Sequence, residues 1–166
     1  FYTKSAEQGN SLAMNNLGFC YQKGIGCDQN YTKCFEWYEK SAKLGNGSAM
    51  NNVGFCYADG KGVMKDLNKA KEWFVKSASQ GDDYAMNELG QCYEKGFGCD
   101  ENFTKAFKWY EKSAKLGHSN AMNNIGVCYH DGKGVTKDIN QAKEWYKKAA
   151  AKGHVGAKAA LDRLHQ

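Results

Sequence analysis

The sequence has no proline, no long apolar run and no large excess of one charge. Proline is absent from all 166 residues, while glycine occurs 19 times. Because proline breaks helix interiors and glycine ends helices, this composition is typical of a mostly helical chain. No apolar segment approaches the ~18 residues that a transmembrane helix needs. No charged segment followed by an apolar one opens the chain, so we expect neither a signal peptide nor direct membrane insertion.

The charge is mild and evenly spread. The chain has 23 Lys and Arg against 18 Asp and Glu, a net charge of +5. Proteins that bind nucleic acid usually concentrate basic residues on one face, and this sequence contains no basic cluster. We therefore predict no nucleic-acid partner. With 42% hydrophobic residues the chain is expected to fold around a packed core.

The most informative feature is an internal repeat of 36 residues. The motif Ala-Met-Asn, followed two residues later by an apolar residue and glycine, begins at positions 13, 49, 85 and 121. Each motif is followed by a tyrosine, a G-x-G turn, a tryptophan and a closing glycine. The first and third repeats share the loop K-G-x-G-C-D, and the second and fourth share D-G-K-G-V. The array thus resembles a 72-residue pair that has been copied once.

Each repeat predicts two short helices. Apolar residues at helical spacing predict a first helix, helix A, over residues 11–23, which Gly24 and Gly26 end. A second helix, helix B, buries a face that includes Tyr38, and Gly45 is suited to its C-terminal end. One equivalent position precedes every helix B and is expected to cap it. Its occupants are Asn30, Asp66, Asn102 and Asp138.

These residues resemble the Sel-one-like (SLR) repeats, relatives of the tetratricopeptide repeat. The pattern is A-x-x-x-L-G-x-x-Y-x-x-G-x-G-V-x-x-D-x-x-K-A-x-x-W-Y-x-K-A-A-x-x-G, and it covers almost the whole chain. Departures are confined to single positions and leave the helix pair intact. They are Cys27 and Cys99 for valine, Asn30 and Asn102 for aspartate, and Cys34 for alanine.

We predict an all-α fold, a right-handed α-solenoid of antiparallel helix pairs that stack to bury their apolar edges. The expected organisation is one solenoid domain over residues 1–166. Its parts are a partial repeat with helix B only (1–9), four full repeats (10–45, 46–81, 82–117 and 118–153) and a C-terminal capping helix (154–166).

The two ends carry their own expectations. Residues 1–2 align with residues 37–38, so the chain begins inside a helix B, and we expect it to be a segment of a longer array. Ala157 and Leu161 begin a fifth helix A. The polar residues near its end predict a solubilising cap close to a natural terminus. They are Asp162, Arg163, His165 and Gln166.

No catalytic, cofactor or metal motif is present in the sequence. Gly60-Lys61-Gly62 and its counterpart at 132–134 lack the context of a phosphate loop and are predicted to be turns between helices. The four histidines have no metal-ligand spacing. His118 and His154 are expected to be exposed caps, and His130 lies at the end of a helix A beside Asp131. We predict no catalytic residues, no cofactor and no metal.

Seven cysteines raise the question of disulfides. Their number is odd, and the four at positions 20, 56, 92 and 128 lie one repeat apart on neighbouring helices. The other three replace small apolar residues. We therefore predict free, buried thiols. The resemblance keeps Cys20–Cys27 and Cys92–Cys99 open as bridges, because some bacterial members of the family link the helices of a repeat.

Three glycosylation sequons begin at Asn30, Asn46 and Asn102. As helix caps, Asn30 and Asn102 would be poor glycan acceptors, which favours a cytoplasmic location. The lumen of the secretory pathway or the extracellular space is the alternative.

Helix A is expected to line a concave partner-binding surface, by resemblance to tetratricopeptide arrays. An asparagine recurs once per repeat and could hold the main chain of a peptide; alternatively, it hydrogen-bonds the neighbouring repeat. Phe19 and Phe55 would make an apolar first half and the later residues a polar second half, whereas the four tryptophans are expected in the core. The candidate binding residues are Asn15, Phe19, Gln22, Asn51, Phe55, Asn87, Gln91, Glu94, Asn123, Val127 and His130.

The predicted function is a non-catalytic scaffold or adaptor that binds a peptide segment or a partner domain. The alternative is a regulatory or docking arm of a larger protein whose enzymatic domain lies outside this segment. An enzyme in its own right is disfavoured, because no nucleophile has a neighbouring base. The sequence does not determine an oligomeric state.

Overall fold

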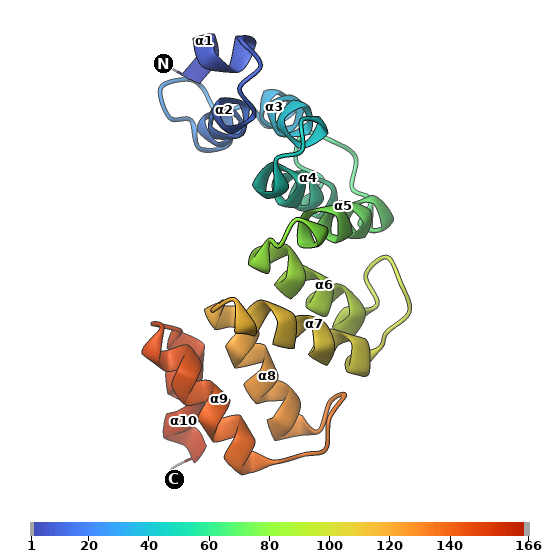
Figure 1. The fold of residues 1–166 in the computed structure, drawn as a ribbon, viewed down its shortest axis with the longest axis vertical. Helices are drawn as coiled ribbons and strands as arrows, with labels where there is room; N and C mark the ends of the chain where they lie inside the picture. The colour runs from blue at the N-terminus through green and yellow to red at the C-terminus, as the bar shows by residue number, and fades with distance from the viewer. Residues whose placement is uncertain (1, 165–166) are drawn as a thin grey trace. The chain divides into compact units, whose positions relative to one another are not determined.

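The computed structural model describes residues 2–164, and this part of the chain contains ten α-helices and no strands (Figure 1). Phe1, His165 and Gln166, which were predicted to belong to the first and last helices, lie outside the described residues. The helices are α1 (Tyr2–Glu7), α2 (Ser11–Lys23), α3 (Tyr31–Lys43), α4 (Gly47–Asp59), α5 (Leu67–Ser79), α6 (Asp83–Lys95), α7 (Phe103–Lys115), α8 (Ser119–Asp131), α9 (Ile139–Ala151) and α10 (Val155–Leu164).

The helices form paired repeats of 36 residues, which confirms the predicted all-α, solenoid-like fold. Helix A is α2, α4, α6 or α8, and the helix B packed against it is α3, α5, α7 or α9. The chain divides into two compact units, residues 1–82 (unit 1) and 83–166 (unit 2). Each unit holds two full helix pairs. The handedness of the stack and the single-domain organisation stay predictions.

The helix boundaries follow the capping residues. Helix α2 spans residues 11–23 as predicted, and Gly24, with φ of 70°, ends it in the left-handed conformation. Asn30 accepts a hydrogen bond from the Lys33 N–H, and Asp66 accepts from the N–H groups of Asn68 and Lys69. Asn102 and Asp138 cap α7 and α9 in the same way. The prediction of one capping position per helix B is therefore confirmed.

A glycine inside each helix A sets the spacing between the two helices of a repeat. A Cβ on Gly18 would lie 2.6 Å from the Tyr38 ring, and one on Gly54 would lie 2.5 Å from the Phe74 ring. These rings are among the most buried side chains, with Tyr38 1% and Phe74 3% exposed. The glycine thus lets the ring of helix B approach the backbone of helix A closely.

Three buried serines join the two helices of a repeat at their other end. Ser41 Oγ donates to the Ser11 carbonyl (2.6 Å), and Ser77 and Ser113 make the same bond one and two repeats later. All three serines are 0% exposed. In the fourth repeat, Ala149 occupies this position. The sequence pattern did not predict the role of these serines, because a small polar residue near a helix end is usually exposed.

The tryptophans differ from the prediction. Trp37 and its equivalents are half-buried, and the ring that fills the core is that of the next residue, such as Tyr38. A lysine three positions later covers each tryptophan; Lys40 Nζ, for example, lies 4.4 Å from the centre of the Trp37 ring. The expectation that the tryptophans are core residues is therefore wrong in part. The reason is that adjacent aromatic residues on a helix diverge by about 100°, so only one of them can point fully inward.

Candidate functional site

The recurring asparagine bonds the neighbouring repeat inside each unit. In unit 1, Asn52 Nδ2 donates to Asn15 Oδ1 over 3.0 Å; in unit 2, Asn124 Nδ2 donates to Asn87 Oδ1 over 3.1 Å. Asn87 is only 1% exposed. Two roles were predicted for this asparagine, binding a peptide or bonding the neighbouring repeat. These two bonds join adjacent repeats, so Asn15 and Asn87 have the second role.

The third repeat departs from this pattern. Glu88 stands where the other repeats have Asn16, Asn52 and Asn124, and a carboxylate has no N–H to donate. Glu88 accepts instead from Asn87 Nδ2 (3.0 Å) and from Gln91 Nε2 (2.9 Å). Burial raises the pKa of this carboxyl. Asn51 is 7% exposed, and its Oδ1 has no hydrogen-bond partner among the described residues.

A polar groove lies on the helix-A side of unit 2. It measures about 280 Å³ and is bordered by α6, α8 and the residue before α10. Three of the predicted residues meet here, together with four that were not predicted. The lining residues are Asn87, Gln91, Glu94, Lys95, Asn120, Asn124 and His154.

The groove contains both hydrogen-bond donors and acceptors, and neighbouring side chains hold its Glu94 carboxylate in position. Glu94 accepts a 2.6 Å hydrogen bond from the hydroxyl of Tyr110, and Lys133 Nζ lies 3.9 Å from its other oxygen. Burial and the contact with Glu94 raise the pKa of Tyr110. His154 Nδ1 accepts from the Ala157 N–H at the start of α10. The Glu94 carboxylate is therefore held in place before any ligand arrives.

In unit 1 the corresponding surface is more apolar. Phe19, which stands where unit 2 has Gln91, is 45% exposed. Phe55 is half-buried and packs edge-on against Phe74, with ring centres 5.3 Å apart. Gln22 accepts a 3.0 Å hydrogen bond from the Tyr38 hydroxyl. Of the two predicted phenylalanines, Phe19 is thus the one with substantial surface open to a partner.

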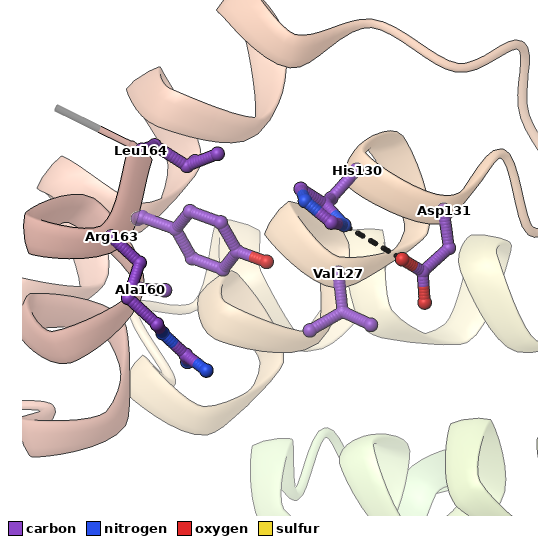
Figure 2. Close-up of a pocket in the computed structure, with 7 residues that line it drawn as sticks. Val127, His130, Asp131, Ala160, Arg163 and Leu164 are labelled. Atoms are coloured by element: carbon purple, nitrogen blue, oxygen red, sulfur yellow. Dashed lines mark hydrogen bonds and ion pairs between the residues drawn. The ribbon is translucent and has the colours of Figure 1, made fainter. Parts of the chain in front are cut away.

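A second pocket of unit 2, of about 390 Å³, is lined by two further predicted residues, Val127 and His130. Figure 2 shows them on α8, facing Ala160, Arg163 and Leu164 of α10. His130 Nδ1 lies 2.7 Å from Asp131 Oδ1, and this contact lowers the pKa of the Asp131 carboxyl. The remaining predicted residue, Asn123, is half-buried on the same helix.

Neither histidine that was predicted to be an exposed cap is exposed, and His154 is half-buried. His118 does cap α8, because its Nδ1 accepts from the Ala121 N–H, but it is buried rather than exposed. The ring of Tyr84, which stacks edge-on at 4.6 Å, covers it. The repeat alignment alone could not show this, because the aromatic residue that covers His118 is absent from the other repeats at that position.

The cysteines and acidic residues form no metal-binding cluster of three or more ligands in residues 2–164. Cys34, Cys56, Cys92 and Cys128 are buried, and the other three cysteines are half-buried; none of the seven is in a disulfide in this structure. No described helix has the length and apolar character needed to cross a bilayer.

The groove residues missing from the sequence prediction are Lys95, Asn120, Asn124 and His154. Asn120 and Asn124 lie four residues apart on α8, so helical spacing alone could have joined them to one face. His154 lies at the start of the next repeat. Its place beside α8 depends on how α10 packs, which the spacing within one repeat does not reveal.

Comparison with known proteins identifies the family. The profile described as Sel1 repeat matches residues 11–46, 47–82, 83–118 and 119–154. The chain belongs to the Sel1 repeat family. SLR proteins are generally non-catalytic and typically act as protein-binding adaptors. No match was found among the curated proteins.

Solved structures show the same fold. A Sel1 repeat protein from Oxalobacter formigenes is 36% identical with a TM-score of 0.90, and the match covers 93% of this chain and 63% of that one. The protein c5321, described as a protective antigen of uropathogenic Escherichia coli, is 32% identical (TM-score 0.88), with 96% and 34% coverage. Helicobacter pylori cysteine rich protein B is 28% identical (TM-score 0.59), with 72% and 91% coverage. The chain therefore spans less than two thirds of the first two proteins.

Proposed function

We propose that this SLR array is a non-catalytic adaptor and that unit 2 binds an extended segment of a partner protein in its polar groove. The observation that carries the proposal is the lining of the groove. Amide groups of Gln91, Asn120 and Asn124 can both donate and accept hydrogen bonds, as a peptide main chain requires. Glu94 and Lys95 add one charge of each sign.

Burial and existing bonds divide the roles among these residues. Asn87 is buried and bonded to Asn124, so it supports the floor of the groove rather than contacting a ligand. Asn120 is exposed. Glu94 is half-buried and already oriented by Tyr110, so a donor on the ligand would meet a fixed acceptor. A groove of this composition favours a polar, extended peptide over an apolar helix.

Unit 1 is proposed to add an apolar contact at Phe19. An exposed aromatic ring beside polar residues is a common anchor at protein interfaces. Lys23 Nζ lies 5.9 Å from the centre of this ring and leaves much of its surface open. Units 1 and 2 would then select different features of a partner.

Selection from a random peptide library, followed by calorimetry, tests the proposal. The selected peptides should bind the intact chain, and Gln91→Ala combined with Asn120→Ala should weaken binding about tenfold, since two hydrogen bonds to the ligand are lost. Asn140→Ala, at an exposed position of α9 outside the groove, is the matched control and should not change the affinity. Circular dichroism should show that the variants are equally helical. Equal binding by the groove variant and the control would refute the proposed site.

We also propose a cytoplasmic location, with the secretory lumen or the extracellular space as the alternative. Support comes from the three sequon asparagines. Asn30, Asn46 and Asn102 each cap a helix and accept a backbone hydrogen bond. Treating the natural protein with an enzyme that removes N-linked glycans should leave its mobility unchanged; a shift would place it in the lumen or outside the cell.

A further inference from the structure

Two cysteines from adjacent repeats meet in one pocket of unit 1. Cys34 comes from α3, the helix B of the first full repeat, and Cys56 comes from α4, the helix A of the second. Both line a cavity of about 180 Å³. They are 1% and 5% exposed, so the packing of α3 against α4 holds each thiol. The two residues are 22 positions apart, and the sequence pattern did not pair them.

The surroundings of the two thiols are polar on one side. The neighbouring Cys56 lowers the pKa of the Cys34 thiol, whereas Cys34 and burial raise the pKa of the Cys56 thiol. Asp59 and Lys61, paired at 2.7 Å, line the same cavity and are exposed to solvent. A small polar reagent thus has a route to the thiols.

Unit 2 provides a natural comparison. Cys128 stands where unit 1 has Cys56, but Ala106 stands where unit 1 has Cys34. Ala106 and Cys128 are 1% and 4% exposed, so the two positions are as buried as in unit 1. The same fold therefore carries two thiols at these buried positions in unit 1, and one thiol and one methyl group in unit 2.

We propose that Cys34 and Cys56 are a redox modification site, at which hydrogen peroxide oxidises the two thiols to a disulfide that joins α3 to α4. In the first step the Cys34 sulfur attacks one peroxide oxygen and the O–O bond breaks. This gives a sulfenic acid on Cys34 and releases one water. In the second step the Cys56 sulfur attacks the sulfenyl sulfur, the S–S bond forms, the S–O bond breaks and a second water leaves. The two thiols lose two electrons and two protons, and the peroxide is reduced to two waters.

The bridge would fasten the first full repeat to the second. Helices α3 and α4 belong to different repeats, and their relative position depends on side-chain packing. A covalent link across this interface would restrict unit 1 and leave unit 2 unlinked. The proposal does not depend on peptide binding in unit 2, because the two sites share no residue.

Peptide mapping of the full chain after treatment with hydrogen peroxide tests the proposal. Cleavage after lysine places the two cysteines on separate peptides, residues 34–40 and 44–61. We expect these two peptides to become the main disulfide-linked pair and to separate on reduction. Cys34→Ala, which installs the residue that the other three full repeats have, should fold normally and lose the linked pair completely.

The converse variant uses unit 2. Ala106→Cys gives unit 2 the thiol pair of unit 1, and peroxide should then link residues 106–108 to residues 116–133, a product that the natural chain does not form. A link between Cys20 and Cys56, between Cys20 and Cys27, or no link at all while the half-buried Cys27 is oxidised, would overturn the proposal. So would failure of the folded Ala106→Cys variant to form its new link.

Discussion

Units 1 and 2 are built from copies of the same 72-residue pair, and comparing them separates the framework from the variable residues. The framework contacts coincide closely. The Asn15–Asn52 and Asn87–Asn124 bonds measure 3.0 and 3.1 Å. The rings of Phe35 and Tyr57 in unit 1 and of Phe107 and Tyr129 in unit 2 pack edge-on, with centres 5.5 Å apart in both pairs. Positions that face the grooves differ instead.

The differences change the chemistry of equivalent places without changing their geometry. A tyrosine of helix B donates to Gln22 in unit 1 and to Glu94 in unit 2. A thiol in unit 1 is a methyl group in unit 2, at Cys34 and Ala106. The duplicated scaffold therefore tolerates changes in charge and reactivity where side chains point into a groove. It keeps the asparagine bonds and the edge-on ring pairs that join one repeat to the next.

The largest effect is expected from the glycines between the helices of a repeat. Gly18→Ala and Gly90→Ala would each place a methyl group against a buried tyrosine ring, and each should lower the free energy of unfolding by about 2–3 kcal/mol. This loss should outweigh the gain of about 1 kcal/mol that alanine brings to a helix interior. Urea denaturation monitored by circular dichroism measures both variants. Unequal losses of unfolding free energy would show that the helix pairs of the two units are not packed equivalently.

The tyrosine hydrogen bond should distinguish the units. Tyr110→Phe removes a bond to a carboxylate and should cost about 1.5–3 kcal/mol, whereas Tyr38→Phe removes a neutral bond and should cost about 0.5–1.5 kcal/mol. The same denaturation experiment compares them. Phe74 is a natural control, because the second repeat folds with a phenylalanine at this position. Equal costs would mean that the charge of Glu94 contributes nothing.

The same tyrosines predict a loss of stability at alkaline pH. Burial raises the pKa of Tyr38 and Tyr110 above the value of about 10 that a tyrosine has in the unfolded chain. Their contribution is complete below pH 10, and it falls as the pH rises above 10, because the unfolded state then releases protons that the folded state keeps. Unfolding curves measured from about pH 8 to about pH 11, on both sides of the ordinary tyrosine pKa, should show this loss of stability. The double variant Tyr38→Phe, Tyr110→Phe should lose less stability over the same range.

The two asparagine hydrogen bonds should contribute unequally to stability, because their acceptor oxygens are buried to different extents. Asn124→Ala leaves the buried Asn87 oxygen without its donor, at a cost of about 1–3 kcal/mol. Asn52→Ala leaves the half-buried Asn15 oxygen, which water can reach, so about 1 kcal/mol is expected. Thermal unfolding of the two variants checks this order. The reverse order would show that the bridges act through something other than their acceptors.

The smallest effect is expected at Glu88, where the repeats themselves differ. A half-buried carboxyl with a raised pKa destabilises the folded state at neutral pH, and this cost disappears as the pH falls through the raised pKa. Glu88→Gln should therefore stabilise the chain at pH 7 by about 0.5–1 kcal/mol and should have no advantage at acidic pH. Unfolding measured at both pH values tests the sign. Destabilisation at pH 7 would show that the hydrogen bonds from Asn87 and Gln91 stabilise the Glu88 carboxylate by more than its burial costs.

Much of the local structure could be predicted from one repeat. The 36-residue period, the bounds of α2, the N-caps at Asn30 and Asp66 and the closing turns depend on contacts within a few residues. Side-chain caps and glycine turns act over three or four positions, so the sequence displays them directly. This explains why helix type and boundaries were predicted well.

The candidate site was predicted only in part, because it forms between repeats. Helical periodicity placed Asn87, Gln91 and Glu94 on one face, and the groove of unit 2 contains all three. It could not show that Asn87 is buried by a bond to a residue 37 positions away, nor that Cys34 and Cys56 line one cavity. The sequence by itself determined the repeat, its helices and their caps, because these are local. Tertiary packing alone decided which polar groups form hydrogen bonds between helices and which remain accessible to a ligand, because that depends on partners far apart in the chain.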